Sequence, residues 1–188
     1  MFNFLLMGAQ GTGKSTLLDR LSSNKINGIG VNSIKSISRE YIASNGLSTG
    51  YETSYTDLFA YYALFLSSFN KSQSSQKINV FDRSILDPLI FARMKFAQKD
   101  YVCILGEEIF CALTKSIHGI IYVPIEFAIF DDGFRSLEST KQQRFDKELR
   151  GLILDWKLNH VTVLGTVEQR LEIIERFIEA QITKQSHD

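Results

Sequence analysis

Residues 8–15 read Gly-Ala-Gln-Gly-Thr-Gly-Lys-Ser, a complete G-x-x-x-x-G-K-S phosphate-binding loop. An apolar run at residues 2–7 precedes the loop and a helical pattern follows it, which is the strand, turn and helix order that the motif requires. In such a loop the backbone N–H groups converge on anionic oxygens, and the dipole of the following helix favours negative charge there. The motif therefore predicts binding of a nucleoside triphosphate.

The residues of this loop have distinct expected roles toward ATP and Mg²⁺. Lys14 should reach the β- and γ-phosphates, and the Ser15 hydroxyl should ligate Mg²⁺. The other positions expected to contact the nucleotide are Gly8, Gln10, Gly11, Thr12, Gly13 and Thr16.

An acidic residue stands directly after the apolar run at residues 78–81, in the sequence Asp82-Arg83-Ser84. At the carboxyl end of a parallel strand it would face the ligand crevice of an open α/β sheet. Asp82 could hold Mg²⁺, directly or through water, or accept a proton from an attacking hydroxyl. Arg83 could neutralise phosphate charge or orient the acceptor. The alternative is that Asp82 only caps the turn that follows.

Two further groups could contact an acceptor. Arg39 and Glu40 follow the second expected strand and could bind a sugar or phosphate in bidentate fashion, or form a solvated ion pair. Tyr55 and Asp57 begin an aromatic helical stripe that is typical of a core, yet both could line an acceptor pocket.

Cations and a glycine follow the last two expected strands. On a mobile helical lid at about residues 130–150, Arg135 or Arg144 would stabilise charge on the γ-phosphate oxygens; the alternative is an ordinary charged helix face. Gly165 would let the backbone approach a flat base such as adenine, although a plain strand-to-helix turn would look the same.

Short apolar runs alternate with helical patterns along the chain. This alternation predicts an α/β fold with a parallel sheet and right-handed crossovers. The strands are expected at residues 2–7, 33–38, 78–81, 119–123 and 160–164. The helices are expected at residues 15–22, 53–69, 87–99, 107–116, 140–158 and 167–182.

Capping residues mark the start of two of these helices. Asp87 is expected as an N-cap, with Pro88 as the first helical residue. Thr166 with Gln169 three residues later predicts a capping box for the last helix.

Composition favours a single domain over residues 1–188, with 44% hydrophobic residues. Lys and Arg total 21, as do Asp and Glu, so the chain has no global field for nucleic acid, although a local basic groove is possible. No apolar run is long enough to span a membrane. Cys103 and Cys111 match no metal or redox spacing, as expected for free, buried thiols of a reducing cytosol. We therefore expect a cytoplasmic protein.

The chain resembles the small P-loop kinases and ATPases related to nicotinamide riboside kinase of the NadR type, a group common in phages. The resemblance rests on the phosphate loop, Ser38-Arg39-Glu40-Tyr41, Phe81-Asp82-Arg83-Ser84 with Asp87 nearby, and Tyr122-Val123-Pro124 followed by Asp132-Gly133-Phe134-Arg135. The Asp-Arg-Ser element also looks like the acid-Arg-Ser motif of deoxynucleoside kinases, in which the acid acts as a base.

The resemblance implies a three-layer α/β/α P-loop NTPase fold with a helical lid. Its parallel sheet would have five strands in the order 2-3-1-4-5. It also implies that Asp87 belongs to the substrate site and, for a phage-encoded chain, a location in the host cytoplasm.

The leading hypothesis is a kinase that moves the γ-phosphoryl group of ATP to a small nucleoside-like acceptor. A hydroxyl acceptor is slightly favoured over the phosphate of a nucleoside monophosphate, the acceptor of adenylate-kinase-like chemistry. The alternatives are a nucleotide-driven regulator that hydrolyses ATP and a kinase acting on a hydroxyl of DNA. The oligomeric state is open, with a dimer one possibility.

Overall fold

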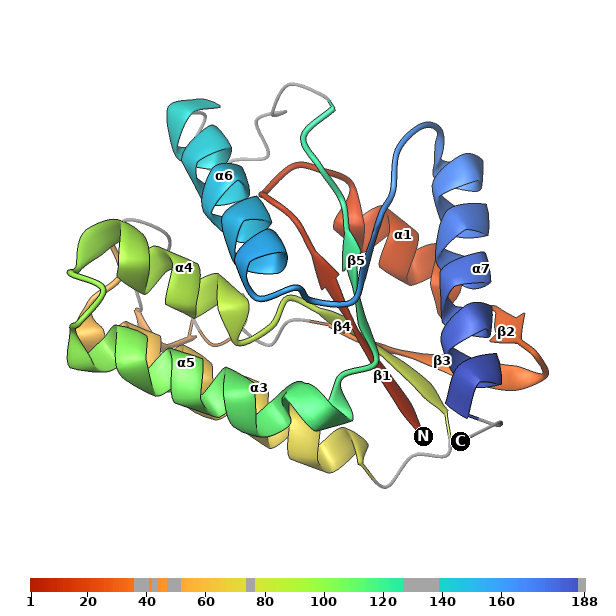
Figure 1. Ribbon diagram of the computed structural model, residues 1–188, viewed down its shortest axis with the longest axis horizontal. Coiled ribbons are helices and arrows are strands. Elements are labelled where there is room, and N and C mark those ends of the chain that lie inside the picture. The colour runs from red at the N-terminus through yellow and green to blue at the C-terminus, as the bar shows by residue number, and fades with distance from the viewer. Residues whose placement is uncertain (36–40, 42–43, 47–51, 74–76, 127–138, 186–188) are drawn as a thin grey trace.

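A mostly parallel sheet forms the centre of this computed structural model, with helices on both faces (Figure 1). The structure describes residues 1–35, 41, 44–46, 52–73, 77–126 and 139–185. The strands are β1 (Phe2–Met7), β2 (Lys25–Ile26), β3 (Ile29–Ile34), β4 (Ile78–Asp82), β5 (Gly119–Tyr122) and β6 (His160–Thr162).

The sheet order is β2-β3-β4-β1-β5-β6, and its five parallel strands follow the predicted order 2-3-1-4-5. The prediction of five strands was incomplete, because β2 adds a sixth, antiparallel strand at the edge beside β3. The predicted bounds 33–38 for the second parallel strand were also wrong, since this strand is β3. The cause is the turn at Asn27 and Gly28, whose φ angles of 49° and 78° suit a tight hairpin that starts β3 at Ile29.

The helices lie near the predicted ranges, with one clear error. The structure contains α1 (Lys14–Leu21), α3 (Tyr55–Ser72), α4 (Leu86–Lys95), α5 (Tyr101–Leu113), the short η2 (Thr114–Ser116), α6 (Ser139–Asp155) and α7 (Val167–Gln185). The boundary between α4 and α5 was misplaced, because the Asp100 carboxylate accepts a hydrogen bond from Val102 N (3.1 Å) and starts α5 six residues before the predicted position 107. Among the described helices, none combines the length and apolarity needed to cross a membrane.

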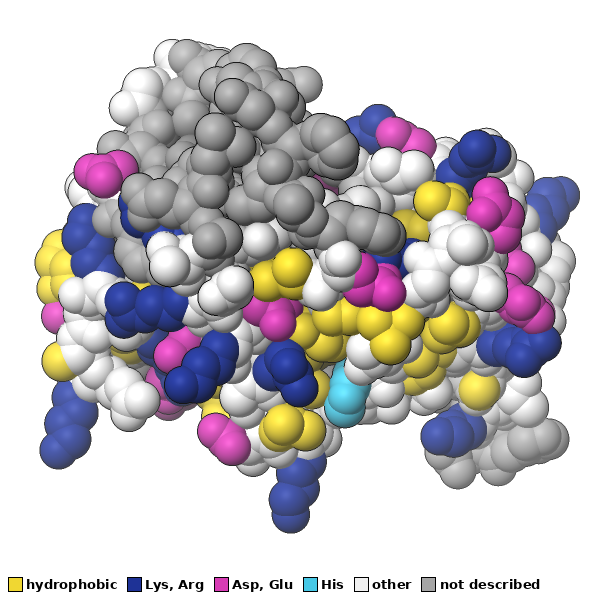
Figure 2. Space-filling view, turned by 90° about the horizontal axis from the view of Figure 1, so that it is seen from above, with side chains coloured by type: hydrophobic (Ala, Val, Ile, Leu, Met, Phe, Trp, Pro, Cys, Tyr) yellow, Lys and Arg dark blue, Asp and Glu magenta, His cyan; other side chains and the backbone are white. Residues whose placement is uncertain are grey.

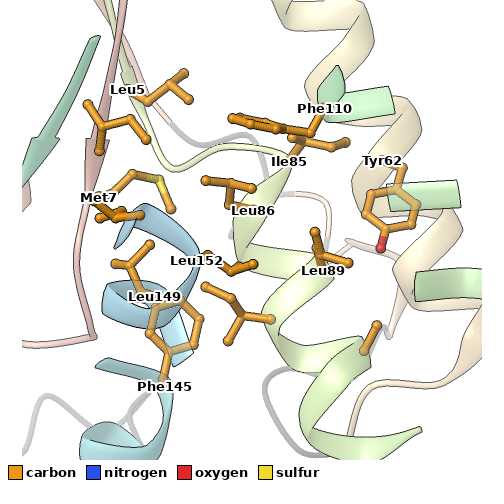
Figure 3. Packing of buried hydrophobic residues seen from close by; sticks show 14 of the residues in the cluster. Leu5, Met7, Tyr62, Ile85, Leu86, Leu89, Phe110, Phe145, Leu149 and Leu152 are labelled. Carbon is orange, nitrogen blue, oxygen red and sulfur yellow. The ribbon is translucent and has the colours of Figure 1, made fainter. Parts of the chain in front are cut away.

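Strand β1 supplies side chains to two hydrophobic cores, one on each face of the sheet. Leu5 and Met7 pack with α3, α4, α5 and α6, as Figure 3 shows in part, whereas Phe4 and Leu6 pack with α1 and α7. Burial on both faces is the reason that the central strands read as continuous apolar runs. Cys103 lies in the first core as expected, but Cys111 is exposed, contrary to the prediction.

Candidate functional site

The phosphate loop joins β1 to α1, as its sequence predicted. Gly13 is the N-cap of α1, and Lys14 is the first helical residue. Gly8 lies at φ 152°, and a Cβ atom there would stand 2.2 Å from the carbonyl oxygen of Val123. Glycine is therefore required at this point, because the loop leaves β1 in direct contact with the segment that follows β5.

Side chains of the loop fix its first turn from within. The Thr12 hydroxyl donates to the carbonyl oxygen of Ala9 (3.0 Å), and Lys14 Nζ donates to the same oxygen and to Thr12 Oγ1 (3.2 Å). Thr12 and Lys14 are both buried, whereas Ser15 and Thr16 are exposed in the first turn of α1. Lys14 therefore lies against the loop itself, at the position from which the motif would bring it to a phosphate.

Two residues that the sequence analysis did not single out hold the loop from outside. Gln142 of α6 donates from Nε2 to the carbonyl oxygen of Gln10 (2.7 Å). Arg170 of α7 donates from Nη1 to the carbonyl oxygen of Thr12 (2.9 Å). Both side chains are buried. One signal could have found Arg170, because it begins a buried stripe that continues every four residues through Ile174, Ile178 and Ile182.

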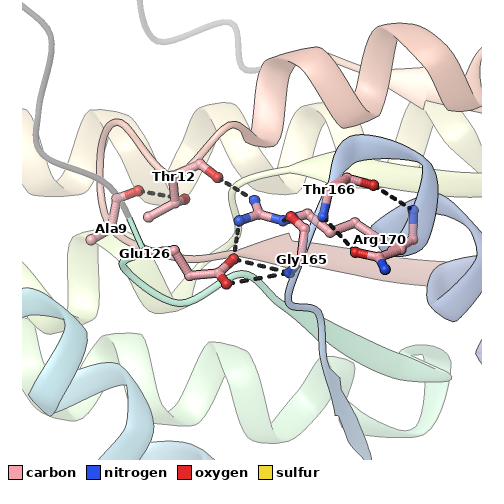
Figure 4. A network of polar contacts seen from close by, with 7 residues as sticks. Ala9, Thr12, Glu126, Gly165, Thr166 and Arg170 are labelled. Atoms are coloured by element: carbon pink, nitrogen blue, oxygen red, sulfur yellow. Dashed lines mark hydrogen bonds and ion pairs between the residues drawn. The ribbon is translucent and has the colours of Figure 1, made fainter.

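Arg170 also joins the loop to the two segments that follow β5 and β6 (Figure 4). Its Nη2 forms an ion pair with Glu126, and its Nε donates to the carbonyl oxygen of Gly165 (2.9 Å). The Gly165 N–H donates to the Glu126 carboxylate (3.2 Å). The structure thus connects Gly165 to the phosphate loop through Arg170.

The chain turns at Gly165 and then enters α7. Gly165 lies at φ 97°, and a Cβ atom there would meet Gln169 Oε1 at 2.3 Å. The predicted capping box is confirmed, since Thr166 N donates to Gln169 Oε1 (2.9 Å) and Gln169 N donates to Thr166 Oγ1 (3.3 Å). A tight turn therefore accounts for glycine at this position, and contact with a base remains a prediction.

Asp82 stands at the carboxyl end of β4, beside the strand that enters the phosphate loop. Its Cα partner across the sheet is Leu6, and the next amide along, Arg83 N, donates to the carbonyl oxygen of Leu6 (3.3 Å). Its side chain is half-buried. The carboxyl ends of β1 and β4 thus bring Asp82 to the same edge of the sheet as the loop, as the sequence predicted.

Arg83 and Asp87 form an ion pair in the turn after β4. Arg83 lies at φ 78°, a strained angle for a residue with a side chain, and its Nη1 donates to Asp87 Oδ1 (2.9 Å). The other Asp87 carboxylate oxygen accepts from Ser84 N (2.8 Å). The positive charge of Arg83 in this turn is therefore paired with the buried carboxylate of Asp87.

The predicted N-cap role of Asp87 was wrong. Helix α4 begins at Leu86, two residues before the predicted first helical residue Pro88, and the Leu86 N–H donates to the Ser84 hydroxyl (2.9 Å). Asp87 lies in the first turn, and its carboxylate accepts a hydrogen bond from the Ser84 N–H. Ser84 and Asp87 thus provide hydrogen-bond acceptors for two backbone N–H groups at the start of the helix. Pro88 accordingly falls within the first turn and is not its first residue.

Ionisable groups of the turn after β4 influence, and are influenced by, groups of the phosphate loop and of α3. Burial raises the pKa of the Asp87 carboxyl, against the opposing effects of Arg83, the Ser84 N–H and Lys14. Burial, together with Asp57, raises the pKa of Tyr61 to about 12, and Arg83 opposes this rise. The ionisable groups of the turn therefore lie within electrostatic reach of both the phosphate loop and α3.

Three of the other residues predicted for the site make structural contacts, one within its own helix start and two with residues of or next to α4. The Asp57 carboxylate accepts from Ser54 N (2.7 Å) and Ser54 Oγ (2.8 Å) in the capping box of α3. Tyr55 stacks on Phe96 with ring centroids 4.3 Å apart. Arg144 Nη2 donates to the carbonyl oxygen of Met94 (2.9 Å) in the last turn of α4. Arg39, Glu40 and Arg135 lie outside the described residues.

The described part of α6 covers most of the predicted lid. Here Phe145, Leu149 and Leu152 are buried in the core against α4 (Figure 3). A lid function for residues 130–150 remains a prediction.

A metal ion would find hard oxygen donors at this edge. Among the described residues, no group of three or more His, Cys, Asp and Glu side chains forms a metal site. The Ser15 hydroxyl and the Asp82 carboxylate fit Mg²⁺, which commonly binds through one or two protein oxygens, water and substrate phosphates. The donor set is therefore compatible with Mg²⁺ that arrives with a nucleotide.

Comparison with known proteins places the chain in a family. The model of an AAA domain family matches residues 3–170, and the chain belongs to this family. No curated protein matches the chain in sequence. Solved structures of small P-loop kinases do match in three dimensions, which confirms the predicted fold class and the predicted resemblance.

The structural matches include three different kinases or kinase-related proteins. NadR in complex with NR superposes with a TM-score of 0.70 at 16% identity over 94% of this chain and 50% of the NadR chain, so this chain spans about half the length of NadR. Deoxyadenosine kinase from M. mycoides with bound dATP gives 0.62 at 14% identity over 94% and 99% of the two chains. Thymidylate kinase from Candida albicans gives 0.65 at 16% identity over 100% and 93%. At these identities the likeness shows a shared fold.

Proposed function

We propose that this chain is a kinase that transfers the γ-phosphoryl group of ATP to a hydroxyl group of a small nucleoside-like molecule. The observation that carries the choice of acceptor is the Arg83–Asp87 ion pair beside Asp82. A phosphate acceptor needs cations that are free to bind its oxygens. Arg83 is instead balanced by Asp87 and also feels the charge of Asp82, so the described groups suit a neutral acceptor.

The phosphate loop would hold the donor nucleotide. Its amides and the start of α1 suit the phosphate oxygens, and Lys14 would contact the β- and γ-phosphates. Ser15 would ligate Mg²⁺, which when bound neutralises charge on the β- and γ-phosphate oxygens. NadR has been solved in complex with NAD and AMP-PNP, which supports a nucleotide role for this fold.

Asp82 is the residue that we assign to the acceptor hydroxyl. The acceptor oxygen would form a bond to the γ-phosphorus while the bond from that phosphorus to the bridging oxygen of ADP breaks. The proton of the hydroxyl would pass to the Asp82 carboxylate. Arg83, held by Asp87, would keep the acceptor oriented during this step.

The other expected contacts belong to the same proposal. Arg39 and Glu40 would bind the acceptor, Arg135 and Arg144 would approach the γ-phosphate, and Gly165 would lie against the base. The charge distribution argues for a small acceptor over nucleic acid. In Figure 2, which views the molecule from above Figure 1, cationic and acidic side chains are interspersed over the coloured part of the face.

The test is release of ADP from Mg-ATP in the presence of a panel of candidate acceptors. The panel holds nucleosides, deoxynucleosides, nicotinamide riboside, nucleoside monophosphates and a short DNA, and products are identified by mass. Stimulation by a nucleoside, with a product heavier by one phosphoryl group, supports the proposal. Hydrolysis that no acceptor changes would instead indicate a regulator, and phosphorylation of DNA or of a monophosphate would assign a different acceptor.

A further inference from the structure

The carbonyl oxygens of the phosphate loop are held by side chains from distant parts of the chain. Gln142 lies 132 residues from Gln10, whose carbonyl oxygen it contacts at 2.7 Å. Arg170 lies 158 residues from Thr12, whose carbonyl oxygen it contacts at 2.9 Å. These two contacts bring α6 and α7 against the same short loop.

Holding a carbonyl also sets the direction of an amide. In a planar trans peptide the C=O and N–H bonds point in opposite directions. A contact that fixes the Gln10 carbonyl on the protein side therefore turns the Gly11 N–H the other way, and a contact on the Thr12 carbonyl does the same for the Gly13 N–H. Amides of this loop are the groups that cradle phosphate oxygens.

Arg170 is suited to hold such a contact rigidly. Its side chain is 4% exposed, and a Cβ atom on Gly13 would lie 3.6 Å from its Nη1. A buried guanidinium is stable only when its charge is paired and its N–H groups are hydrogen-bonded. Glu126 supplies the opposite charge, and the carbonyl oxygens of Thr12 and Gly165 accept two of the N–H groups (Figure 4).

We propose that Arg170, oriented by Glu126, is a positioning residue of the nucleotide site that aims the Gly13 amide at the phosphate chain, and that Gln142 aims the Gly11 amide in the same way. This inference rests on the nucleotide binding in the proposed function and is independent of the acceptor. Its consequence is that affinity for a nucleoside diphosphate depends on two side chains that need not touch the nucleotide.

The experiment measures the dissociation constant of Mg-ADP by calorimetry for folded variants, well below their unfolding temperatures. Arg170→Met should raise it about 10- to 100-fold, because a charge-assisted hydrogen bond is lost. Gln142→Met should raise it about 3- to 10-fold, because the lost bond is neutral. Arg170→Lys, which can restore one contact, should recover part of the loss.

Arg176→Met is the matched control. Arg176 lies on the same helix, is 75% exposed and pairs with Glu172 one turn away, so its loss should leave the dissociation constant unchanged. A Glu126→Gln and Arg170→Met double-mutant cycle should show the two residues coupled in Mg-ADP binding.

Two outcomes would overturn the inference. A folded Arg170→Met variant with lowered thermal stability and an unchanged Mg-ADP constant would make the residue purely structural. Should that variant fail to fold, unchanged binding in both Gln142→Met and Glu126→Gln would have the same meaning. Failure of the wild-type protein to bind Mg-ADP would instead contradict the nucleotide site itself.

Discussion

The phosphate loop and the turn after β4 lie at the ends of neighbouring strands, yet they present opposite kinds of group. The loop follows β1 and offers backbone amides, a helix start and Lys14. The turn follows β4 and surrounds its one cation, Arg83, with the carboxylates of Asp82 and Asp87. An anion is favoured on the first side and a neutral, proton-bearing group on the second.

The two regions also differ in how they are held. Contacts to the loop come from α6 and α7, through Gln142 and Arg170. The turn is stabilised by its own neighbours, because Asp87 bonds to Arg83 and Ser84 within four residues. The conformation of the phosphate loop therefore depends in part on contacts from distant helices, whereas the turn after β4 is held mainly by hydrogen bonds between its own residues.

The largest effect should come from removing the cation of the loop. Lys14→Met should lower kcat/KM for ATP-dependent phosphorylation by on the order of 10³-fold, because the transferring phosphoryl group loses its main protein charge. Steady-state kinetics would measure the loss, with circular dichroism to verify folding. Lys25→Met, at an exposed position on β2, is the control and should remain active. Normal activity of the Lys14→Met variant would contradict the assignment of the phosphate loop as the side that binds the anionic donor.

A smaller but sharper effect should come from the acceptor side. Asp82→Asn should lower kcat by about 10²-fold or more while Mg-ATP affinity changes only a few-fold, because the proton of the acceptor loses its base. Rates are measured at saturating nucleotide, with the exposed Asp155→Asn as control. Activity recovered by excess Mg²⁺ would assign Asp82 to the metal instead. An unchanged kcat would return Asp82 to a capping role.

The smallest effect should appear at the other end of the strands, away from both regions. Burial lowers the pKa of His118, whose ring packs against Phe2 and whose Nδ1 accepts from Asn3 N (3.1 Å). The unfolded chain therefore binds the proton more readily, and stability present above about pH 6.5 should decline as the pH falls below it.

Urea unfolding between pH 5 and pH 8 measures this decline in the free energy of unfolding. His118→Gln should flatten the profile, whereas substitution of the exposed His160 should leave it in place. A pH profile that His118→Gln does not alter would show that the buried imidazole is not its source.

The sequence predicted the donor side better than the rest because its signals are local. The phosphate loop is one contiguous motif, and most of the parallel strands are plain apolar runs that could be located from the sequence. The order of the five parallel strands came instead from the resemblance to small P-loop kinases, and the structure has that order. The hairpin that begins at Asn27 was missed because β3 is only partly buried and lacks a continuous apolar run. The start of α5 was missed because its cap, Asp100, was not recognised.

The spacing of the stripe on α7 indicates that Arg170 is buried, but local sequence patterns could not predict which groups Arg170 and Gln142 contact. Gln142 and Arg170 stand on ordinary amphipathic helices, and nothing in their neighbours indicates that they meet Gln10 and Thr12. Only the packing of α6 and α7 brings them there. The ion pair between Arg83 and Asp87 likewise became known only from the structure, because the sequence shows one arginine and two acidic residues without showing which of them pair.

The most direct test of the contrast between the two sides is a matched pair of acceptors. The measurement is kcat/KM of the wild-type protein, with saturating Mg-ATP, for a nucleoside and for its own 5′-monophosphate. We expect a clear preference for the nucleoside, since Arg83 is already paired and two carboxylates repel a phosphate. Preference for the monophosphate would contradict the assignment of a neutral acceptor, because the turn after β4 would then have to bind an anion.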